Sequence, residues 1–250
     1  MKRACVAAIL AALLLPGLIV AEAQFPYRIS KPRAMFGIME GGAIWYRLIN
    51  PAATDTDAVH SAYPASALQD TSFAFTAAED STLTAGSAYV GYYEVSFSRL
   101  VSVTVSAPSV AHAAIAADSV WIYGTNMMGA AISDIYVTDA DTPASIAGSK
   151  AFASIDSIVI ARQDSAGVLV SVGRGLKVGL PMTVPMYTVL GSWQDGTQAN
   201  LSDTTVGIDA TDIEKNTIYN DATPWDGSTD YDFLIWIPPF GDVGGTTKWQ

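Results

Sequence analysis

The sequence contains almost none of the residues that build disulfide frameworks or thiolate metal sites. Among its 250 residues there is one cysteine, Cys5, and there are two histidines, His60 and His112. A single cysteine cannot close an intrachain disulfide, and structural zinc sites need about four cysteine or histidine ligands. We therefore expect the fold to be held together by burial of apolar side chains and by assembly.

Charge is also scarce, and basic charge is the scarcer kind. Only 15% of the residues are charged, with 13 lysines and arginines against 24 aspartates and glutamates, for a formal net charge of −11. An acidic surface repels the phosphate backbone, so nucleic-acid binding is disfavoured. Half of the residues are hydrophobic, which is enough for one large β domain or two small ones and argues against disorder.

Recognisable catalytic motifs are missing as well. Neither histidine lies next to a candidate nucleophile, and residues 191–195 (GSWQD) depart from the GxSxG nucleophile elbow at its last position. His112 sits among alanines, where a packed or surface side chain is the simplest explanation. We predict that the protein is not an enzyme and has neither catalytic residues nor an organic cofactor.

The N-terminus has the organisation of a signal peptide. Residues 1–3 are basic, residues 6–20 are almost wholly apolar, and Ala21-Glu22-Ala23 places small residues at the spacing of a cleavage site. The apolar run is shorter than the roughly 20 residues of a spanning helix, and a Pro-Gly pair interrupts it. We expect residues 1–23 to be a short hydrophobic helix that is removed. A retained membrane anchor and an arm buried by a partner are the alternatives.

Short runs of β-branched and aromatic residues, separated by turn residues, dominate the rest of the chain. Between residues 95 and 106, for example, hydroxyl side chains alternate with Val101, Val103 and Val105, as in a strand with one buried face. This pattern predicts an all-β fold, an antiparallel β-sandwich or a jelly-roll-like domain. Further strands are expected at residues 118–124, 131–138, 150–161, 167–173, 183–190, 204–210, 215–220 and 231–237.

Composition also divides the chain into regions. Residues 51–72 collect proline, aspartate and alanine without a sustained period, which predicts a surface loop. Residues 107–117 are compatible with one short helix, and a boundary is expected near residue 100. The predicted regions are the signal peptide or anchor at 1–23, an N-terminal arm and β-containing region at 24–99, a β-sandwich domain at 100–240, and a tail at 241–250.

Two patterns inside the predicted sandwich indicate how its strands pack. Residues 150–160 (KAFASIDSIVI) are partly apolar on both faces, which predicts a central or covered strand. Gly173, Gly175 and Gly179 predict a bulged bend where backbones approach closely, and Pro181 would end that strand. A phosphate-binding loop would need a helix after the glycines, so a bend required by the fold is the favoured interpretation.

Three elements of this region carry a resemblance to a known group of proteins. They are GTNMMGAAIS at residues 124–133, GSKAFASIDSI at residues 148–158 and VSVGRGLKVGLP at residues 170–181. In this order they resemble a β-rich module of structural proteins of tailed bacteriophages, namely capsid-associated, decoration and fibre-like proteins. The resemblance spans residues 100–237 at most. It implies a virion structural protein that assembles with itself and with other virion structural proteins.

Closely spaced aspartates provide the candidate metal site. Asp226, Asp230 and Asp232 place carboxylates at short spacings that suit hard cations such as calcium, and so do Asp139 and Asp141. Neither segment matches an EF-hand loop, and aspartate is an ordinary turn former. Calcium binding and turn formation therefore both remain as interpretations. A glycosidase pair is a third interpretation, but sequence spacing does not establish the separation of the two carboxylates on which that chemistry depends.

Aromatic residues near the C-terminal end form a candidate ligand-binding or interface set. Carbohydrate platforms are commonly built from such rings, which makes glycan binding the second hypothesis. Residues 231–237 are apolar on both faces, however, and this favours packing between layers or subunits. The candidate aromatic residues are Trp193, Trp225, Tyr231 and Trp236.

The main prediction from the sequence is a structural function. We predict a virion component, capsid-associated or decorating, that acts as a homo-oligomer through assembly and not through catalysis. The alternative is a secreted or cell-surface bacterial β-sandwich protein that binds glycans. The N-terminal segment bears on this choice, because most virion proteins assemble in the cytoplasm and carry no signal peptide.

Overall fold

The computed structural model describes residues 42–91, 93–182, 189–209, 211–222 and 224–237. The predicted signal peptide or hydrophobic helix at residues 1–23 lies outside the described residues. The same is true of the arm at residues 24–41, of the tail at residues 241–250 and of most of the strand expected at residues 183–190.

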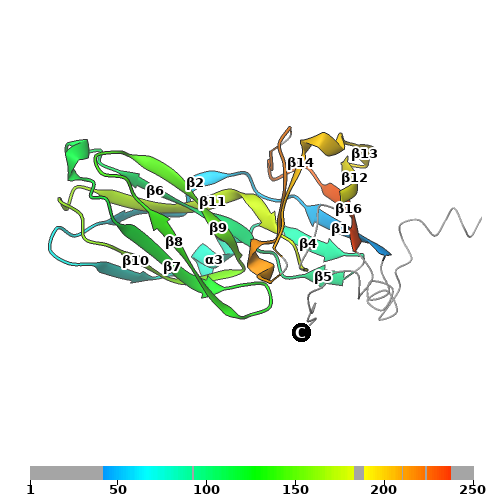
Figure 1. Ribbon diagram of the computed structural model, residues 1–250, viewed down its shortest axis with the longest axis horizontal. Helices are drawn as coiled ribbons and strands as arrows, with labels where there is room; N and C mark the ends of the chain where they lie inside the picture. The colour runs from blue at the N-terminus through cyan, green and yellow to red at the C-terminus, as the bar shows by residue number, and fades with distance from the viewer. Residues whose placement is uncertain (1–41, 92, 183–188, 210, 223, 238–250) are drawn as a thin grey trace, which may run out of the picture.

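The fold is all-β, as predicted, and the paired strands of the described residues are antiparallel. These strands form three sheets, which we call A, B and C. Sheet A has the order β13-β12-β16-β1-β4-β5 and lies at one end of the elongated molecule in Figure 1. Its strands are β1 (Gly42–Ile49), β4 (Ser87–Val90), β5 (Tyr93–Val95), β12 (Val189–Gln194), β13 (Thr197–Gln198) and β16 (Tyr231–Ile237).

Sheets B and C make up the rest of the molecule. Sheet C has the order β3-β10-β7-β8, with β3 (Thr71–Ala74), β7 (Ser119–Thr125), β8 (Ala131–Val137) and β10 (Ser154–Ile160). Sheet B has the order β14-β15-β11-β6-β9, and a further strand, β2, also pairs with β11. Its strands are β2 (Asp55–Pro64), β6 (Arg99–Ser106), β9 (Ala144–Phe152), β11 (Leu169–Gly179), β14 (Thr204–Gly207) and β15 (Thr217–Asn220).

Two hydrophobic cores lie along the molecule, and β11 contributes to both. The first core lies between sheets B and C and contains Val170 and Val172 from the first half of β11. The second lies beneath sheet A and contains Val178 from the end of β11, with Leu180 just after it. We call the part of the molecule around the first core the first lobe, and the part around the second core the second lobe. Because one continuous strand enters both cores, the lobes share part of their packing.

Glycines make the long course of β11 sterically feasible. Its pairing with β6 shifts register between Arg174 and Val178, which confirms the predicted bulged bend. A Cβ atom on Gly173 would overlap the backbone of β2, and one on Gly175 would lie 2.9 Å from the carbonyl oxygen of Leu100. The glycines therefore allow close backbone approach, as the sequence indicated.

The predicted covered strand at residues 150–160 is in fact two strands in two sheets. The chain leaves sheet B after Phe152 and enters sheet C at Ser154. A bulge next to Asp156 then brings Ile155 and Ile158 to the same buried side, although a regular alternation would separate them. Both faces of the predicted strand are partly apolar because its two halves belong to different sheets.

The predicted loop at residues 51–72 was wrong, because β2 and the start of β3 lie there. Val59 and Tyr63 are buried in the first core, while most other side chains of β2 are at least partly exposed. Pairing of β2 with β11 shifts register twice, and Ser61, which lies between the two buried positions, is exposed. These irregularities removed the period of two on which strand recognition depends.

The helix prediction at residues 107–117 was also wrong. Only a three-residue 3₁₀ helix, η1 (His112–Ala114), occurs there, and the backbone is extended at both flanking residues. The described α-helix is α3 (Ala77–Leu83), where Thr76 and Glu79 form a capping box. Two other 3₁₀ helices are η2 (Leu201–Asp203) and η3 (Ile213–Lys215).

Strand pairing crosses the boundary that the sequence suggested near residue 100. Strands β1 and β4 precede it but belong to sheet A, where β1 pairs with β16 from the other end of the chain. Strand β2 also precedes it and pairs with β11 in the first lobe. Both lobes therefore contain residues from either side of position 100.

Candidate functional site

The four candidate aromatic residues fall into two groups. Trp225 and Tyr231 are buried in the second core, where their rings meet edge to face at 4.6 Å. Trp225 Nε1 donates to the carbonyl oxygen of Leu176, and the Tyr231 hydroxyl donates to that of Pro224. Burial raises the pKa of Tyr231 to about 12. Their contacts are those of core residues, which was the packing alternative.

Trp193 and Trp236 lie on the outer face of sheet A, where both are half-buried. Trp193 has a partner that the sequence analysis missed, because its ring centroid lies 4.8 Å from that of Trp45 at an interplanar angle of 33°. Any Cβ on Gly191 would overlap the Trp193 ring, so this glycine makes room for the indole. We call Trp45 and Trp193 the tryptophan pair.

A signal for Trp45 was present in the sequence. In β1 the side chains of Ile44, Tyr46 and Leu48 are buried, so Trp45 and Arg47 must project to the other face. The alternation of β1 thus identifies an outward tryptophan. It does not reveal that β12, almost 150 residues later, supplies the second ring.

Charged groups surround the tryptophan pair. Trp45 Nε1 donates to Asp232 Oδ1 at 3.0 Å, and Arg47 Nη2 lies 2.7 Å from Asp230 Oδ2. Arg47 Nε is 3.7 Å from Asp232, while the Asp230 amide donates to the Asp195 carboxylate. Burial raises the pKa of Asp232. The hydrogen bond from Trp45 and the charge of Arg47 act in the opposite direction and lower it. The face therefore combines aromatic rings with fixed hydrogen-bonding groups.

The three aspartates of the candidate calcium site have separate protein partners. Asp226 accepts hydrogen bonds from the amides of Ser228 and Thr229, and these bonds lower its pKa to about 2. Asp230 pairs with arginine and Asp232 with tryptophan, as described above. In the described part of the chain, no group of three aspartate, glutamate, histidine or cysteine residues is placed to hold a metal ion. The calcium prediction therefore has no geometric support among these residues.

The other aspartate pair is found in a turn. Asp141 has a positive φ of 60°, a conformation that aspartate tolerates better than most residues, and its amide donates to the carbonyl of Ile115. Asp139 lies just before this turn and is exposed. These positions are consistent with turn formation.

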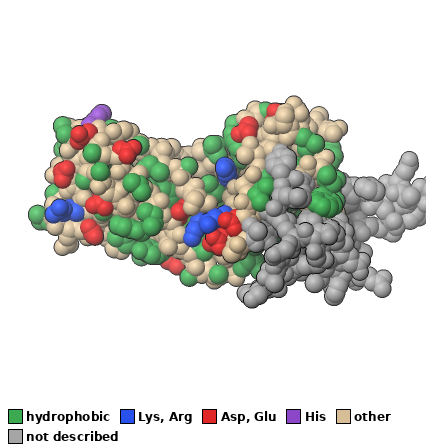
Figure 2. Space-filling model, in the orientation of Figure 1, with side chains coloured by type: hydrophobic (Ala, Val, Ile, Leu, Met, Phe, Trp, Pro, Cys, Tyr) green, Lys and Arg blue, Asp and Glu red, His purple; other side chains and the backbone are tan. Residues whose placement is uncertain are grey.

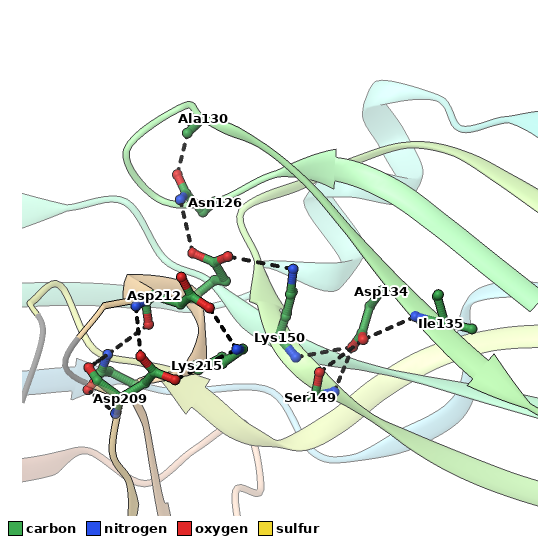
Figure 3. A network of polar contacts seen from close by, with 11 residues as sticks. Asn126, Ala130, Asp134, Ile135, Ser149, Lys150, Asp209, Asp212 and Lys215 are labelled. Atoms are coloured by element: carbon green, nitrogen blue, oxygen red, sulfur yellow. Dashed lines mark hydrogen bonds and ion pairs between the residues drawn. The ribbon is translucent and has the colours of Figure 1, made fainter.

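A polar bridge joins the two lobes (Figure 3). Glu214 lies in η3, between β14 and β15, whose Val206 and Ile218 pack in the second core. Its carboxylate is 3.7 Å from the Lys150 ammonium of β9. The same carboxylate accepts a 3.3 Å hydrogen bond from the Asn126 side-chain amide. The Asn126 side-chain oxygen, Oδ1, accepts in turn from the backbone amides of Met128 and Ala130, which fixes the β7–β8 loop. We call Asn126, Lys150 and Glu214 the lobe bridge.

Residues next to Glu214 hold η3 in position. Lys215 lies 2.6 Å from Asp212 and 3.7 Å from Asp209. The Asn216 side chain donates to the backbone carbonyls of both aspartates, and Asp209 accepts from the amides of Thr211 and Asp212. These amides lower the pKa of Asp209. The second-lobe side of the bridge is thus positioned by local hydrogen bonds.

Asp134 holds the corner where sheets B and C meet (Figure 3). It lies on β8, and its buried carboxylate accepts from the Ser149 amide at 2.6 Å, the Ser149 hydroxyl at 2.9 Å and the Lys150 amide at 3.1 Å on β9. A side chain at Gly148 would overlap the Tyr136 hydroxyl, so glycine permits the approach. Asp134 joins the two strand edges in place of a backbone ladder.

Two arginines tie the segment after β1 to the bend in β11. Arg99 is fully buried and donates to the carbonyls of Gly175, at 2.8 Å, and Ala52. Burial, with a smaller effect from Arg174, lowers the pKa of Arg99 to about 9. Arg174 donates to the carbonyls of Ala53 and Thr82. Their described hydrogen-bond acceptors are backbone carbonyls, which gives both arginines a bracing function.

The two histidines lie apart in the first lobe. His60 Nε2 is 3.6 Å from Glu79 Oε1, and the imidazole stacks on Tyr63 with a centroid distance of 3.7 Å. His112 is exposed in η1. These contacts explain His60 as a packed side chain at the edge of the first core.

Comparison with protein-family models, with curated proteins and with solved structures found no match. The resemblance to tailed-phage structural proteins therefore stays a prediction. In the described residues, no helix is both long enough and apolar enough to cross a membrane.

Proposed function

We propose that the protein is a structural component of a virus particle, capsid-associated or decorating, which acts by assembling with copies of itself and with other virion proteins. The observation that carries this proposal is the sharing of β11 by both hydrophobic cores. The shared strand, the buried Arg99 and the lobe bridge together connect two sandwich-like lobes as one braced body. A protein that maintains the geometry of an assembly needs such resistance to bending between its lobes.

The position of the first and last described strands, β1 and β16, supports the same proposal. Gly42 at the start of β1 pairs with Ile237 at the end of β16. The segments before and after the described chain therefore both continue from the same end of sheet A. Segments that leave one end of a rigid body suit contacts with neighbouring subunits, as extended arms make in symmetric assemblies.

Sedimentation of intact particles tests the proposal. Particles from the source culture are banded in a density gradient, and this protein is quantified against the most abundant particle protein in each fraction. We expect a constant ratio across the particle band. Absence of the protein from the banded particles would overturn the proposed function.

The tryptophan pair favours glycan binding as a second candidate function. Aromatic faces flanked by carboxylate, guanidinium and amide groups provide both the stacking and the hydrogen bonds that sugars use. A glycan array compares the unchanged protein with Trp193→Ala. Trp121→Ala is the matched control, because Trp121 is a half-buried tryptophan on the outer face of sheet C. This candidate requires binding that is lost in Trp193→Ala and retained in Trp121→Ala.

A further inference from the structure

The outer face of sheet C carries an exposed apolar patch. Strand β8 alternates strictly, with Asp134 and Tyr136 buried and with Ile135 and Val137 exposed to 56% and 64%. On β7 the outward side chains include Tyr123, which is also exposed. Figure 2 shows hydrophobic side chains gathered over the region where Figure 1 places β7 and β8. The inward side chains already fill the first core, so folding alone does not require this patch.

Strand register arranges the patch as a row across the sheet. Trp121 on β7 lies opposite Ile135 on β8 and opposite Val159 on β10. One step along β7, Tyr123 lies opposite Ser133 and Ser157 on the same two strands. A central aromatic residue is thus flanked by aliphatic residues on both sides, with hydroxyl groups beside them. A buried aromatic centre with a polar rim is the composition of a protein interface.

The centre of the patch is uncharged although the chain is strongly acidic. The acidic residue within β8, Asp134, points inward and is buried, while Asp156 is exposed at the bulge of β10, beside Ser157 at the edge of the patch. The chain as a whole has a net charge of −11. Two identical acidic molecules repel each other least where their surfaces carry no charge. An anionic membrane, by contrast, is bound through lysine and arginine, which the patch lacks.

We propose that the outer face of sheet C binds the same face of a second copy of this chain. A two-fold axis parallel to β7 and midway between the two Trp121 side chains would stack the two tryptophans and set Val159 of each copy against the partner's Ile135. The hydroxyl groups of Ser133 and Ser157 would meet in the same way. Two sheets packed face to face in this manner lie about 10 Å apart. The inference rests on the proposed assembly function and names a surface for it.

The size of the face indicates how strong the contact is. Four strands about 4.8 Å apart and about seven residues long, at roughly 3.3 Å per residue, cover on the order of 450 Å². A standard stable interface buries about 800 Å² on each partner. The contact is therefore weak between two free molecules. It becomes persistent where many copies are held side by side, because each contact is then intramolecular within the assembly.

Sedimentation equilibrium of the purified full chain tests this contact without particles. We expect the average mass to rise from 26.3 kDa toward twice that value as concentration approaches about 1 mM, the weak end of protein affinities. Ile135→Glu would place an unpaired charge in the contact and raise the dissociation constant about tenfold or more. Leu190→Glu is the matched control, because Leu190 on sheet A is exposed to 53% and lies outside the patch.

A mixture of two variants tests the two-fold arrangement. Val159→Lys alone should also stay monomeric, whereas an equal mixture of Ile135→Glu and Val159→Lys should associate, because each glutamate then faces a lysine. Unchanged thermal unfolding shows that each variant folds. A wild-type chain that remains monomeric at every concentration, or an Ile135→Glu chain that associates like wild type, overturns the inference. A mixture that fails to associate overturns the two-fold register. Particle sedimentation is a separate measurement, so failure of this contact is distinguishable from failure of the proposed function.

Discussion

Asp134 shows how a single carboxylate can replace a stretch of sheet. It receives two amide hydrogen bonds and one hydroxyl hydrogen bond from β9, at a corner where β8 and β9 belong to different sheets. Hydrogen bonds to a charged acceptor contribute more than neutral ones, and their loss leaves part-buried amides without this acceptor. Asp134 is therefore a more sensitive position than its place in an otherwise hydrophobic strand suggests.

Substitution of Asp134 by alanine should lower the free energy of unfolding by about 3 kcal/mol or more, because the Ser149 and Lys150 amides lose their acceptor. Urea unfolding followed by circular dichroism measures the change. Asp156→Ala is the control, since Asp156 is exposed on the bulge of β10, and its effect should stay within about 0.5 kcal/mol. Equal effects of the two substitutions would show that the hydrogen bonds of Asp134 do not stabilise the corner between sheets B and C.

Buried tyrosines predict how stability depends on alkaline pH. Burial raises the pKa of Tyr63 and of Tyr231 from 10.0 to about 12. The folded state thus keeps phenol protons that the unfolded chain releases near pH 10. This contribution to stability is complete below pH 10 and is lost as pH rises toward 12. Urea midpoints should fall over this interval, together with delayed tyrosinate absorbance.

Tyr63→Phe provides the control for this prediction. The variant should lose part of the alkaline dependence, because phenylalanine has no proton to release. Tyr123→Phe, at an exposed position, should retain the full dependence. Stability that stays constant from pH 10 to pH 12 would show that the phenols do not govern it.

At the scale of elements, predictability depended on whether a strand is regular. The alternation of Val101, Val103 and Val105 identified β6, because this strand keeps one continuously buried face. Strand β2 was not predicted because its two register shifts against β11 disrupt the alternation of buried and exposed residues. The glycine-rich bend of β11 was predicted because its cause, close backbone approach, requires residues without side chains.

Pairings between distant elements account for what the sequence could not predict at the candidate sites. Trp45 and Trp193 are adjacent only because β16 lies between β1 and β12. Trp225 and Trp193 have similar local sequences, rich in turn residues, yet one is in the core and the other on a surface. Whether a tryptophan is buried or lies on the surface depends on how the strands of sheet A pair around it. Those strands come from distant parts of the sequence.

The lobe bridge should contribute a measurable coupling energy between elements of different lobes. Lys150→Met and Glu214→Gln form a double-mutant cycle, and we expect a coupling of about 0.5–1 kcal/mol because the pair is mostly shielded from water. The neighbouring Lys215–Asp212 pair is more exposed, and its cycle should give a smaller coupling. A coupling of zero between Lys150 and Glu214 would show that the lobe bridge does not hold the two lobes together.

At the scale of the whole molecule, sharing of β11 should make unfolding a single transition. Val172→Ala opens a cavity in the first core and Val178→Ala opens one in the second, at a cost of about 2 kcal/mol each. Both variants should shift the same midpoint to the same extent in both lobes. Hydrogen exchange under native conditions, read separately for β7 and β16, measures this. A variant that loosens only its own lobe would contradict a shared core.

The pairing of the first described strand with the last also determines how sheet A responds to force. The start of β1 and the end of β16 lie side by side. Tension that separates the two terminal segments would therefore open this ladder one hydrogen bond at a time, the weakest loading geometry of a sheet. Tension that draws both segments in one direction would load the ladders of sheet A together. Anchoring both segments to the same neighbour would thus give a strong attachment, whereas anchoring them to neighbours that move apart would make sheet A the first part to yield.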